Sequence, residues 1–157
     1  MKNIKMNFMR LSSLLLIVLL GACSPKTLPT GEVNYTGSTD TGTISLSSTG
    51  YHNGSINNAI EEAEKQAFET LLFRGVPGSQ VPNAMIGTDE SEIKSKYKDY
   101  FQDFYGNRRC RTFIMSSSKS YSGRKQAFTS VTLELKINFH ALRKDLENKG
   151  LKRGFGL

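Results

Sequence analysis

The chain has 157 residues, of which 38% are hydrophobic, with a formal net charge of +7 and two cysteines. This length suits one domain with a modest core, and two cysteines exclude a small protein held together by several disulfides. Three of the cations, Lys2, Lys5 and Arg10, precede the first long apolar run. The remaining charge is only mildly positive, so it does not indicate binding to nucleic acid.

The first 22 residues have the pattern of an export signal. After the three cations comes an apolar run, residues 14–20, which is followed by Gly21, Ala22 and Cys23. A helix of this length measures about 10 Å, whereas the hydrocarbon core of a bilayer is about 30 Å thick. We therefore expect residues 1–22 to be a cleavable signal peptide and not a membrane-spanning helix.

The end of this signal, Leu20-Gly21-Ala22-Cys23, resembles the lipobox of bacterial lipoproteins. The resemblance implies that diacylglycerol is attached to the Cys23 thiol, that the chain is cut before this residue, and that the new amine receives a fatty acid such as palmitate. Several acyl chains make a stable anchor, because each buried CH₂ contributes about 0.8 kcal/mol. The alternative interpretation is an ordinary secretory signal in which the cysteine occurs by chance.

The residues after the cysteine indicate a location. By resemblance to sorted lipoproteins, an aspartate after the cysteine favours the inner membrane, whereas this chain has Ser24. Residues 25–29 also lack the acidic cluster that marks surface-exported lipoproteins in some Gram-negative groups. We therefore expect a lipid anchor in the outer membrane and a domain that faces the periplasm.

The chain after the signal divides into a tether and one domain. Residues 23–40 are rich in Pro, Gly, Ser and Thr, and they are expected to form a flexible tether because they bury too little apolar surface to offset ordering. Residues 41–157 are expected to form a single domain, in which the spacing of apolar residues predicts helices and strands.

The first half of the domain is predicted to contain a strand at 41–49, a helix from a cap at Asn53 or Ser55 to about Arg74 with Gly75 as its stop, and a loop at 75–88. A second helix is predicted from Asp89 to Tyr105, with Gly106 as its stop. The remaining elements are a strand at 112–118, a turn at 121–124, a strand at 126–139 and a helix at 141–149. This β-α-α-β-β-α order predicts an α+β fold. We expect a small antiparallel sheet of about three strands with the helices packed on one face.

The sequence shows no catalytic or metal-binding motif. His52 and His140 have no Cys, Asp or Glu at metal-ligand spacing, and Cys110 has no evident base and orienting group. We therefore expect a protein that is not an enzyme and that holds no metal or cofactor. An enzyme that uses Cys110 as a nucleophile is the minor alternative.

A compact basic cluster follows the second predicted helix. Arg108, Arg109 and Arg111 fit phospholipid head groups or an acidic partner, and they equally fit a role in stabilising the C-terminus of that helix. The helix itself has an aromatic face, which more often belongs to a core than to a docking groove. Its members are Tyr97, Tyr100, Phe101 and Phe104.

A second candidate surface lies where the first predicted helix turns into a loop. Arg74, Val76 and Pro77 belong to this corner, and a helix stop at Gly75 does not explain the length of the loop that follows. Long ordered loops in compact domains often carry function. We therefore include these three residues among the possible partner-binding residues.

The corner L-F-R-G-V-P-G-S, the segment K-Y-K-D-Y-F and the ending F-G-L resemble small outer-membrane lipoproteins of Bacteroidota. The layout is also similar to the small α+β domains of flagellar and curli-associated lipoproteins. The resemblance implies a non-enzymatic structural or assembly subunit of a cell-envelope complex, and the lipoprotein of the type VI secretion membrane complex is one candidate. The partners would be the outer membrane and envelope proteins, with no nucleic acid.

The alternative function is a periplasmic module that binds peptidoglycan or a lipid. In that case the loop at 75–88 and the three arginines of the basic cluster would form the binding site. The sequence does not decide between this module and a subunit of an envelope complex.

Overall fold

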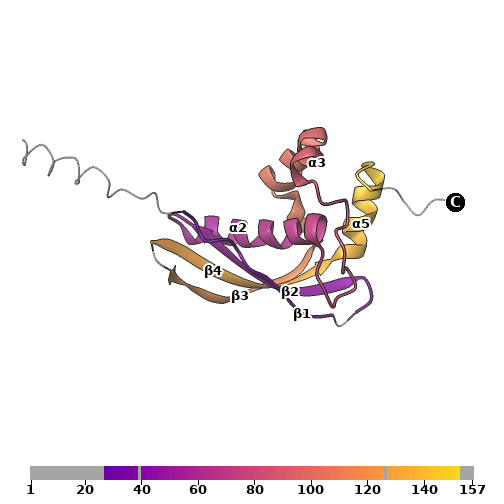
Figure 1. Ribbon diagram of the computed structural model, residues 1–157. Coiled ribbons are helices and arrows are strands. Elements are labelled where there is room, and N and C mark those ends of the chain that lie inside the picture. The colour runs from indigo at the N-terminus through magenta and orange to yellow at the C-terminus, as the bar shows by residue number, and fades with distance from the viewer. Residues whose placement is uncertain (1–26, 39, 126, 153–157) are drawn as a thin grey trace, which may run out of the picture.

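The computed structural model describes residues 27–38, 40–125 and 127–152, which form an α+β domain built on one antiparallel sheet (Figure 1). The predicted fold class is confirmed. The four strands of the described part lie in the order β1-β2-β4-β3, and each pair of neighbours is antiparallel. Their bounds are β1 Val33–Gly37, β2 Thr43–His52, β3 Ile114–Lys125 and β4 Phe128–Asn138.

The helices lie on one face of this sheet, as expected. They are α2 Ile56–Glu69, α3 Glu90–Lys96, α4 Lys98–Phe101 and α5 Phe139–Asn148, with π-helical turns η1 Thr70–Arg74 and η2 Gln102–Gly106 and a 3₁₀ turn η3 Arg109–Phe113. Across the described residues, every helix is too short or too polar to cross a bilayer.

The two central strands, β2 and β4, set the inner face of the sheet. Their residues alternate between buried and half-buried positions, so one row of side chains points at the helices and the other row points away. The inward row is Ile44, Leu46, Val131, Leu133, Leu135 and Ile137, all buried. This strict alternation is what the sequence predicted for residues 126–139.

Helix α2 packs directly on this inner face. Ala59, Ala63 and Ala67 are fully buried in its contact with the sheet, and small side chains let the backbone come close. The closest approach is at Gly50, where an added Cβ atom would lie 2.3 Å from both the Ala59 carbonyl oxygen and the Ala63 nitrogen. The Ser48 hydroxyl donates a hydrogen bond of 2.7 Å to the Ala63 carbonyl in the same contact.

The opposite side of α2 is covered by a second layer of helices, formed by residues 90–113. Phe68 of α2 meets Phe104 edge to face, with ring centroids 5.4 Å apart. Phe101 and Phe104 are buried, so the interpretation of the aromatic face as core is confirmed for these two residues. Helix α2 therefore lies between the sheet and this helical layer (Figure 1).

Several predicted helix ends are confirmed. The Ser55 side chain accepts a hydrogen bond from the Asn58 amide, and the Asp89 side chain accepts one from the Glu92 amide. The first helix ends at Gly75, as predicted, but its last five residues form a π-helical turn. The last helix begins two residues earlier than predicted, at Phe139.

The tether prediction was wrong for its second half. Residues 33–37 form strand β1, which pairs with β2, so the sheet has four described strands where about three were expected. Cross-strand hydrogen bonding to β2 supplies the stabilisation that the few apolar side chains of this segment do not provide. Asp40 also belongs to the domain, because its carboxylate lies 2.6 Å from the Lys136 ammonium.

Two further predictions were wrong in detail. The turn expected at 121–124 is part of β3, which pairs with β4 as far as Lys125 and has register shifts near Ser116 and Tyr121. The helix expected from Asp89 to Tyr105 is broken at Tyr97, whose φ and ψ are −114° and 40°. The break lets the Tyr97 hydroxyl reach the Gly150 carbonyl, at 3.0 Å, while Phe101 and Phe104 enter the core.

We expect Gly50→Ala to lower the free energy of unfolding by about 1–3 kcal/mol, because the added methyl group overpacks the contact between β2 and the α2 backbone. Urea denaturation followed by circular dichroism measures this loss. Gly106→Ala is the matched control. The atom nearest to the Cβ added there is a carbon of the flexible Gln102 side chain, at 3.9 Å. Equal stability of the two variants would contradict the close approach.

Candidate functional site

The expected lipid attachment site, Cys23, lies outside the described residues. The described chain starts at Thr27, four residues later. Four extended residues reach at most about 14 Å. The chain is held against the domain at Glu32, whose carbonyl accepts a hydrogen bond of 2.8 Å from the Thr49 amide.

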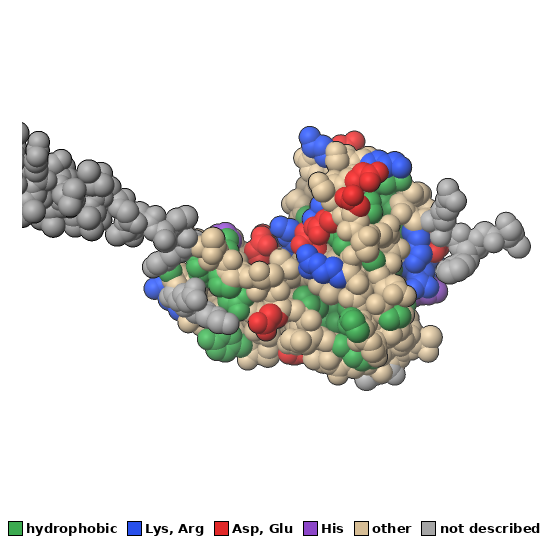
Figure 2. Space-filling model, in the orientation of Figure 1, with side chains coloured by type: hydrophobic (Ala, Val, Ile, Leu, Met, Phe, Trp, Pro, Cys, Tyr) green, Lys and Arg blue, Asp and Glu red, His purple; other side chains and the backbone are tan. Residues whose placement is uncertain are grey.

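The arginines of the basic cluster are engaged in ion pairs within the domain. Arg111 donates three hydrogen bonds of 2.7–3.0 Å to the Glu64 carboxylate of α2. Arg108 lies 2.8 Å from the Glu61 carboxylate and 3.6 Å from that of Glu64. Figure 2 shows the result, with blue and red side chains next to one another where the helical layer meets α2.

The buried partner in this group is Glu64, whose residue is only 2% exposed. A buried carboxylate is costly unless it is paired and hydrogen-bonded, and here two guanidinium groups face it. The hydrogen bonds to Glu64 raise the pKa of Arg111 above its ordinary value. The pair therefore joins η3 to α2.

Arg109 joins the same region to the last helix. It contacts the Asp103 carboxylate at 2.6 Å and the Asp145 carboxylate of α5 at 3.1 Å, and its guanidinium lies 5.0 Å from the Tyr100 ring centroid. Asp145 also accepts a hydrogen bond of 2.8 Å from the Tyr100 hydroxyl. Burial of Tyr100, together with this hydrogen bond, raises the pKa of its hydroxyl.

The structure therefore gives all three arginines an internal role. They are paired with four carboxylates from α2, η2 and α5, so they do not form a free cationic surface. This is closer to the structural interpretation of the cluster than to the ligand-binding one, although the partners lie on other elements and not only at one helix end.

The corner residues Arg74, Val76 and Pro77 do not act as one surface. Val76 is buried, whereas Arg74 and Pro77 are exposed. The loop after them is fixed by backbone hydrogen bonds, from the Val76 amide to the Val81 carbonyl at 2.7 Å and from the Met85 amide to the Leu71 carbonyl at 3.1 Å. Val81 and Met85 are also buried, so packing explains much of the length of the loop.

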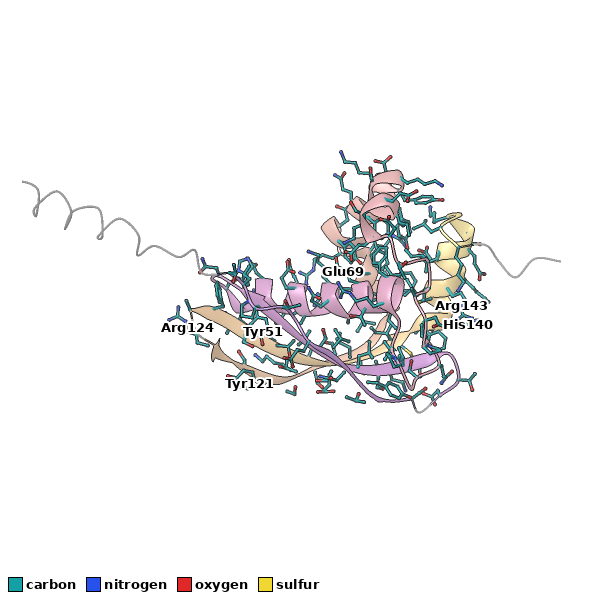
Figure 3. All side chains as sticks on the ribbon, in the orientation of Figure 1. Tyr51, Glu69, Tyr121, Arg124, His140 and Arg143 are labelled. Carbon is teal, nitrogen blue, oxygen red and sulfur yellow. The ribbon has the colours of Figure 1, made fainter. Side chains whose placement is uncertain are left out.

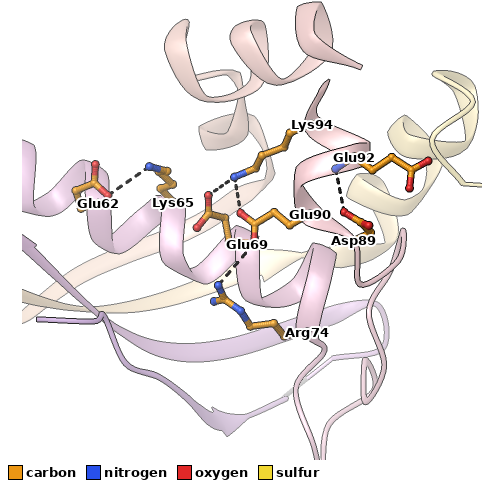
Figure 4. A network of polar contacts seen from close by, with 8 residues as sticks. All are labelled: Glu62, Lys65, Glu69, Arg74, Asp89, Glu90, Glu92 and Lys94. Atoms are coloured by element: carbon orange, nitrogen blue, oxygen red, sulfur yellow. Dashed lines mark hydrogen bonds and ion pairs between the residues drawn. The ribbon is translucent and has the colours of Figure 1, made fainter. Parts of the chain in front are cut away.

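Arg74 belongs to a network of charges between α2 and α3 (Figure 4). Its guanidinium lies 3.7 Å from Glu90, and Lys94 lies 2.6 Å from both Glu90 and Glu69. Burial on its own lowers the pKa of Lys94, but the hydrogen bonds to the two carboxylates outweigh it and raise the pKa. Figure 3 places Glu69 at the junction of α2 and the helices above it.

Cys110 has the surroundings of an unreactive thiol. It is 5% exposed, and burial raises its pKa to about 11, so the nucleophilic thiolate is scarce at neutral pH. Its neighbours in a small cavity of about 70 Å³ include Glu64, Tyr105 and Arg108. Among the described residues, no group of three or more His, Cys, Asp or Glu side chains could hold a metal ion.

The structure adds a surface that the sequence did not indicate, the edge strand β3. Residues 115–122 are exposed on both faces of the sheet. Among them are the large side chains of Met115 and Tyr121. Lys119, Arg124 and Lys125 lie in this strand, and it contains no Asp or Glu. The signal in the sequence is the run of polar residues at 116–122, where the strand predicted at 112–118 ends and the turn predicted at 121–124 begins.

Beside this edge, the outer face of the sheet is polar and slightly hollow. The hollow has a volume of about 430 Å³ and is lined mainly by hydroxyl and charged side chains, Thr36, Ser45, Ser116, Ser118, Glu134 and Lys136. It lacks the apolar lining typical of a small-molecule pocket. We therefore regard this face as a polar surface next to the β3 edge.

No protein-family model matches the chain, and neither a curated protein nor a solved structure is significantly similar to it.

We expect Arg111→Ala to lower the free energy of unfolding by about 1–3 kcal/mol, because Glu64 then stays buried with only the more distant Arg108 as a partner. The half-exposed position of Arg111 keeps the loss below that of a fully buried pair. Urea denaturation measures it. The double variant Arg111→Ala/Glu64→Leu should recover part of the loss.

Lys65→Ala is the control for this pair. It removes an exposed ion pair of 3.6 Å with Glu62 on the same helix, and its cost should stay within about 0.5 kcal/mol. If Arg111→Ala destabilised the domain no more than Lys65→Ala, the Glu64 pair would not hold η3 on α2.

Proposed function

We propose that this chain is a lipid-anchored protein of the outer membrane, which faces the periplasm and serves as a structural or assembly subunit of a cell-envelope complex. The observation that carries the proposal is the position of Cys23. It follows the apolar run and the small residues Gly21 and Ala22, and it precedes the described domain by only four residues. A cysteine there joins a signal directly to a folded domain.

The described part of the chain supports a role without catalysis. The Cys110 thiol is buried and its pKa is raised to about 11, which disfavours it as a nucleophile. Lys94 and the three arginines of the basic cluster form ion pairs within the domain, as in a structural network. The proposal therefore assigns the function to the surface of the domain.

The β3 edge is the surface that best fits a protein partner. An exposed edge strand can accept an extended segment through main-chain hydrogen bonds. Two copies of β3 would bring lysine and arginine side chains together, which is unfavourable, so we assign the edge to a partner segment that carries acidic side chains. The type VI secretion membrane complex is one candidate source of this partner. This suggestion rests on the resemblance to small outer-membrane lipoproteins of Bacteroidota.

A peptidoglycan- or lipid-binding module that uses the arginine cluster is the second candidate. The ion pairs of Arg108, Arg109 and Arg111 weigh against it, because a ligand would have to compete with Glu61, Glu64, Asp103 and Asp145. The exposed part of the loop at 75–88 is the remaining basis for such a site.

We expect Cys23→Ser to abolish incorporation of a labelled fatty acid and to release the protein from the membrane fraction, because it removes the thiol that would carry the lipid. Mass spectrometry of the mature N-terminus and fractionation of the envelope measure both effects. Cys110→Ala is the matched control and should keep lipid and location. An unmodified N-terminus in the wild-type chain, or a Cys23→Ser variant that stays in the membrane, would overturn the anchor.

We expect Lys119→Glu to reduce recovery of partner proteins after cross-linking and detergent extraction of the envelope. Replacing an attractive cross-strand pair by a repulsive one costs about 1–2 kcal/mol, which corresponds to roughly 5- to 30-fold in affinity. Lys144→Glu, on the exposed side of α5, is the control with the same charge change. Equal recovery with both variants would exclude the β3 edge, and recovery of the chain alone would count against an envelope complex.

A further inference from the structure

Three segments meet at the end of the domain where the described chain begins. They are residues 27–31, residues 51–56 at the end of β2 and the start of α2, and residues 124–125 and 127–129 at the facing ends of β3 and β4, and we call this the anchor-proximal end. The Thr129 hydroxyl donates a hydrogen bond of 2.6 Å to the Gly54 carbonyl, and Thr129 lies between His52 and Arg124 in the sheet. Helix α5 lies at the opposite end (Figure 1).

This end combines exposed apolar and basic side chains. Leu28 is 53% exposed and Ile56 is 45% exposed. Arg124 is exposed at the tip of the sheet, where Figure 3 labels it, and Figure 2 shows apolar side chains grouped around the same end. Aliphatic side chains next to a cation are typical of a surface that lies in the interface of a bilayer.

A hollow lies between the segment at 27–31, the end of β2 and helix α2. It has a volume of about 360 Å³, and the segment at 27–31 forms one of its walls. Its lining residues are Leu28, Pro29, Gly31, Tyr51, His52, Glu62 and Gln66. The one carboxylate among these lining residues, Glu62, lies 3.6 Å from the Lys65 ammonium, so its negative charge is balanced.

The length of chain before Thr27 restricts what can cover this end. If Cys23 carries the anchor, the residues between it and Thr27 reach at most about 14 Å, which is only about twice the thickness of one head-group layer. The anchor-proximal end must then stay beside the membrane surface. The far end, with α5, has no such restriction.

We infer that the anchor-proximal end lies on the phospholipid head groups, with Leu28 and Ile56 inserted among them and Arg124 beside lipid phosphates. This inference rests on the proposed lipid anchor and adds an orientation to it. The sheet and α2 then extend away from the membrane, and the β3 edge stays accessible from the side.

The test uses the full lipidated chain, reconstituted into vesicles of phosphatidylethanolamine and phosphatidylglycerol. Leu28→Cys and Ile56→Cys are each labelled with an environment-sensitive fluorophore, and Ser95→Cys and Lys144→Cys, at exposed positions of α3 and α5, are the matched controls. The buried Cys110 is not expected to react under the same conditions. Mass spectrometry verifies in each sample that Cys23 carries lipid.

We expect labels at 28 and 56 to emit at shorter wavelength and to be quenched at least threefold more by nitroxide lipids than labels at 95 and 144. The orientation would be overturned if, in a lipidated chain, aqueous iodide quenched the labels at 28 and 56 as strongly as the control labels. That result would leave the proposed anchor intact. Protection of 56 in native envelopes but not in vesicles would assign this end to a protein and also overturn the inference. A chain without lipid would instead overturn the proposed anchor.

Discussion

The fold depends on the close approach of α2 to the sheet at Gly50. No side chain separates the two backbones there, and Ala59 and Ala63 complete the contact. The helix therefore packs closely on the inward row of β2 and β4 side chains, and its opposite side is also buried. Phe68 and Glu64 occupy that second side, and the helical layer is built upon them.

The helical layer is held to α2 by two different interactions. Aromatic rings around Phe104 supply apolar contact, while Glu64 and Glu69 supply buried carboxylates that need cationic partners. Arg111 and Lys94 meet that need from η3 and α3. Charges that look available for a ligand in the sequence therefore fix the layer, and the edges and ends of the sheet remain as candidate functional surfaces.

The proposed anchor, the anchor-proximal end and the β3 edge fit one arrangement. In this arrangement a short connection to lipid would keep one end of the sheet on the membrane, and β3 runs from the helical layer toward that end. A partner that adds to β3 would then be held beside the membrane at a defined height. In this arrangement the rigid part of the chain sets the position of the partner, and the tether contributes little to its reach.

The α+β class, a helix cap at Asn53 or Ser55, the cap at Asp89, the helix stop at Gly75 and the inward row of β4 were predictable from the sequence, because caps, stops and alternation depend on neighbouring residues along the chain. The sequence did not determine β1, the break at Tyr97 or the partners of the three arginines. β1 exists through pairing with β2, Tyr97 turns toward Gly150, and Glu64 meets Arg111 across 47 positions of sequence. Only tertiary structure decides such features, since each depends on groups that folding brings together from distant parts of the chain.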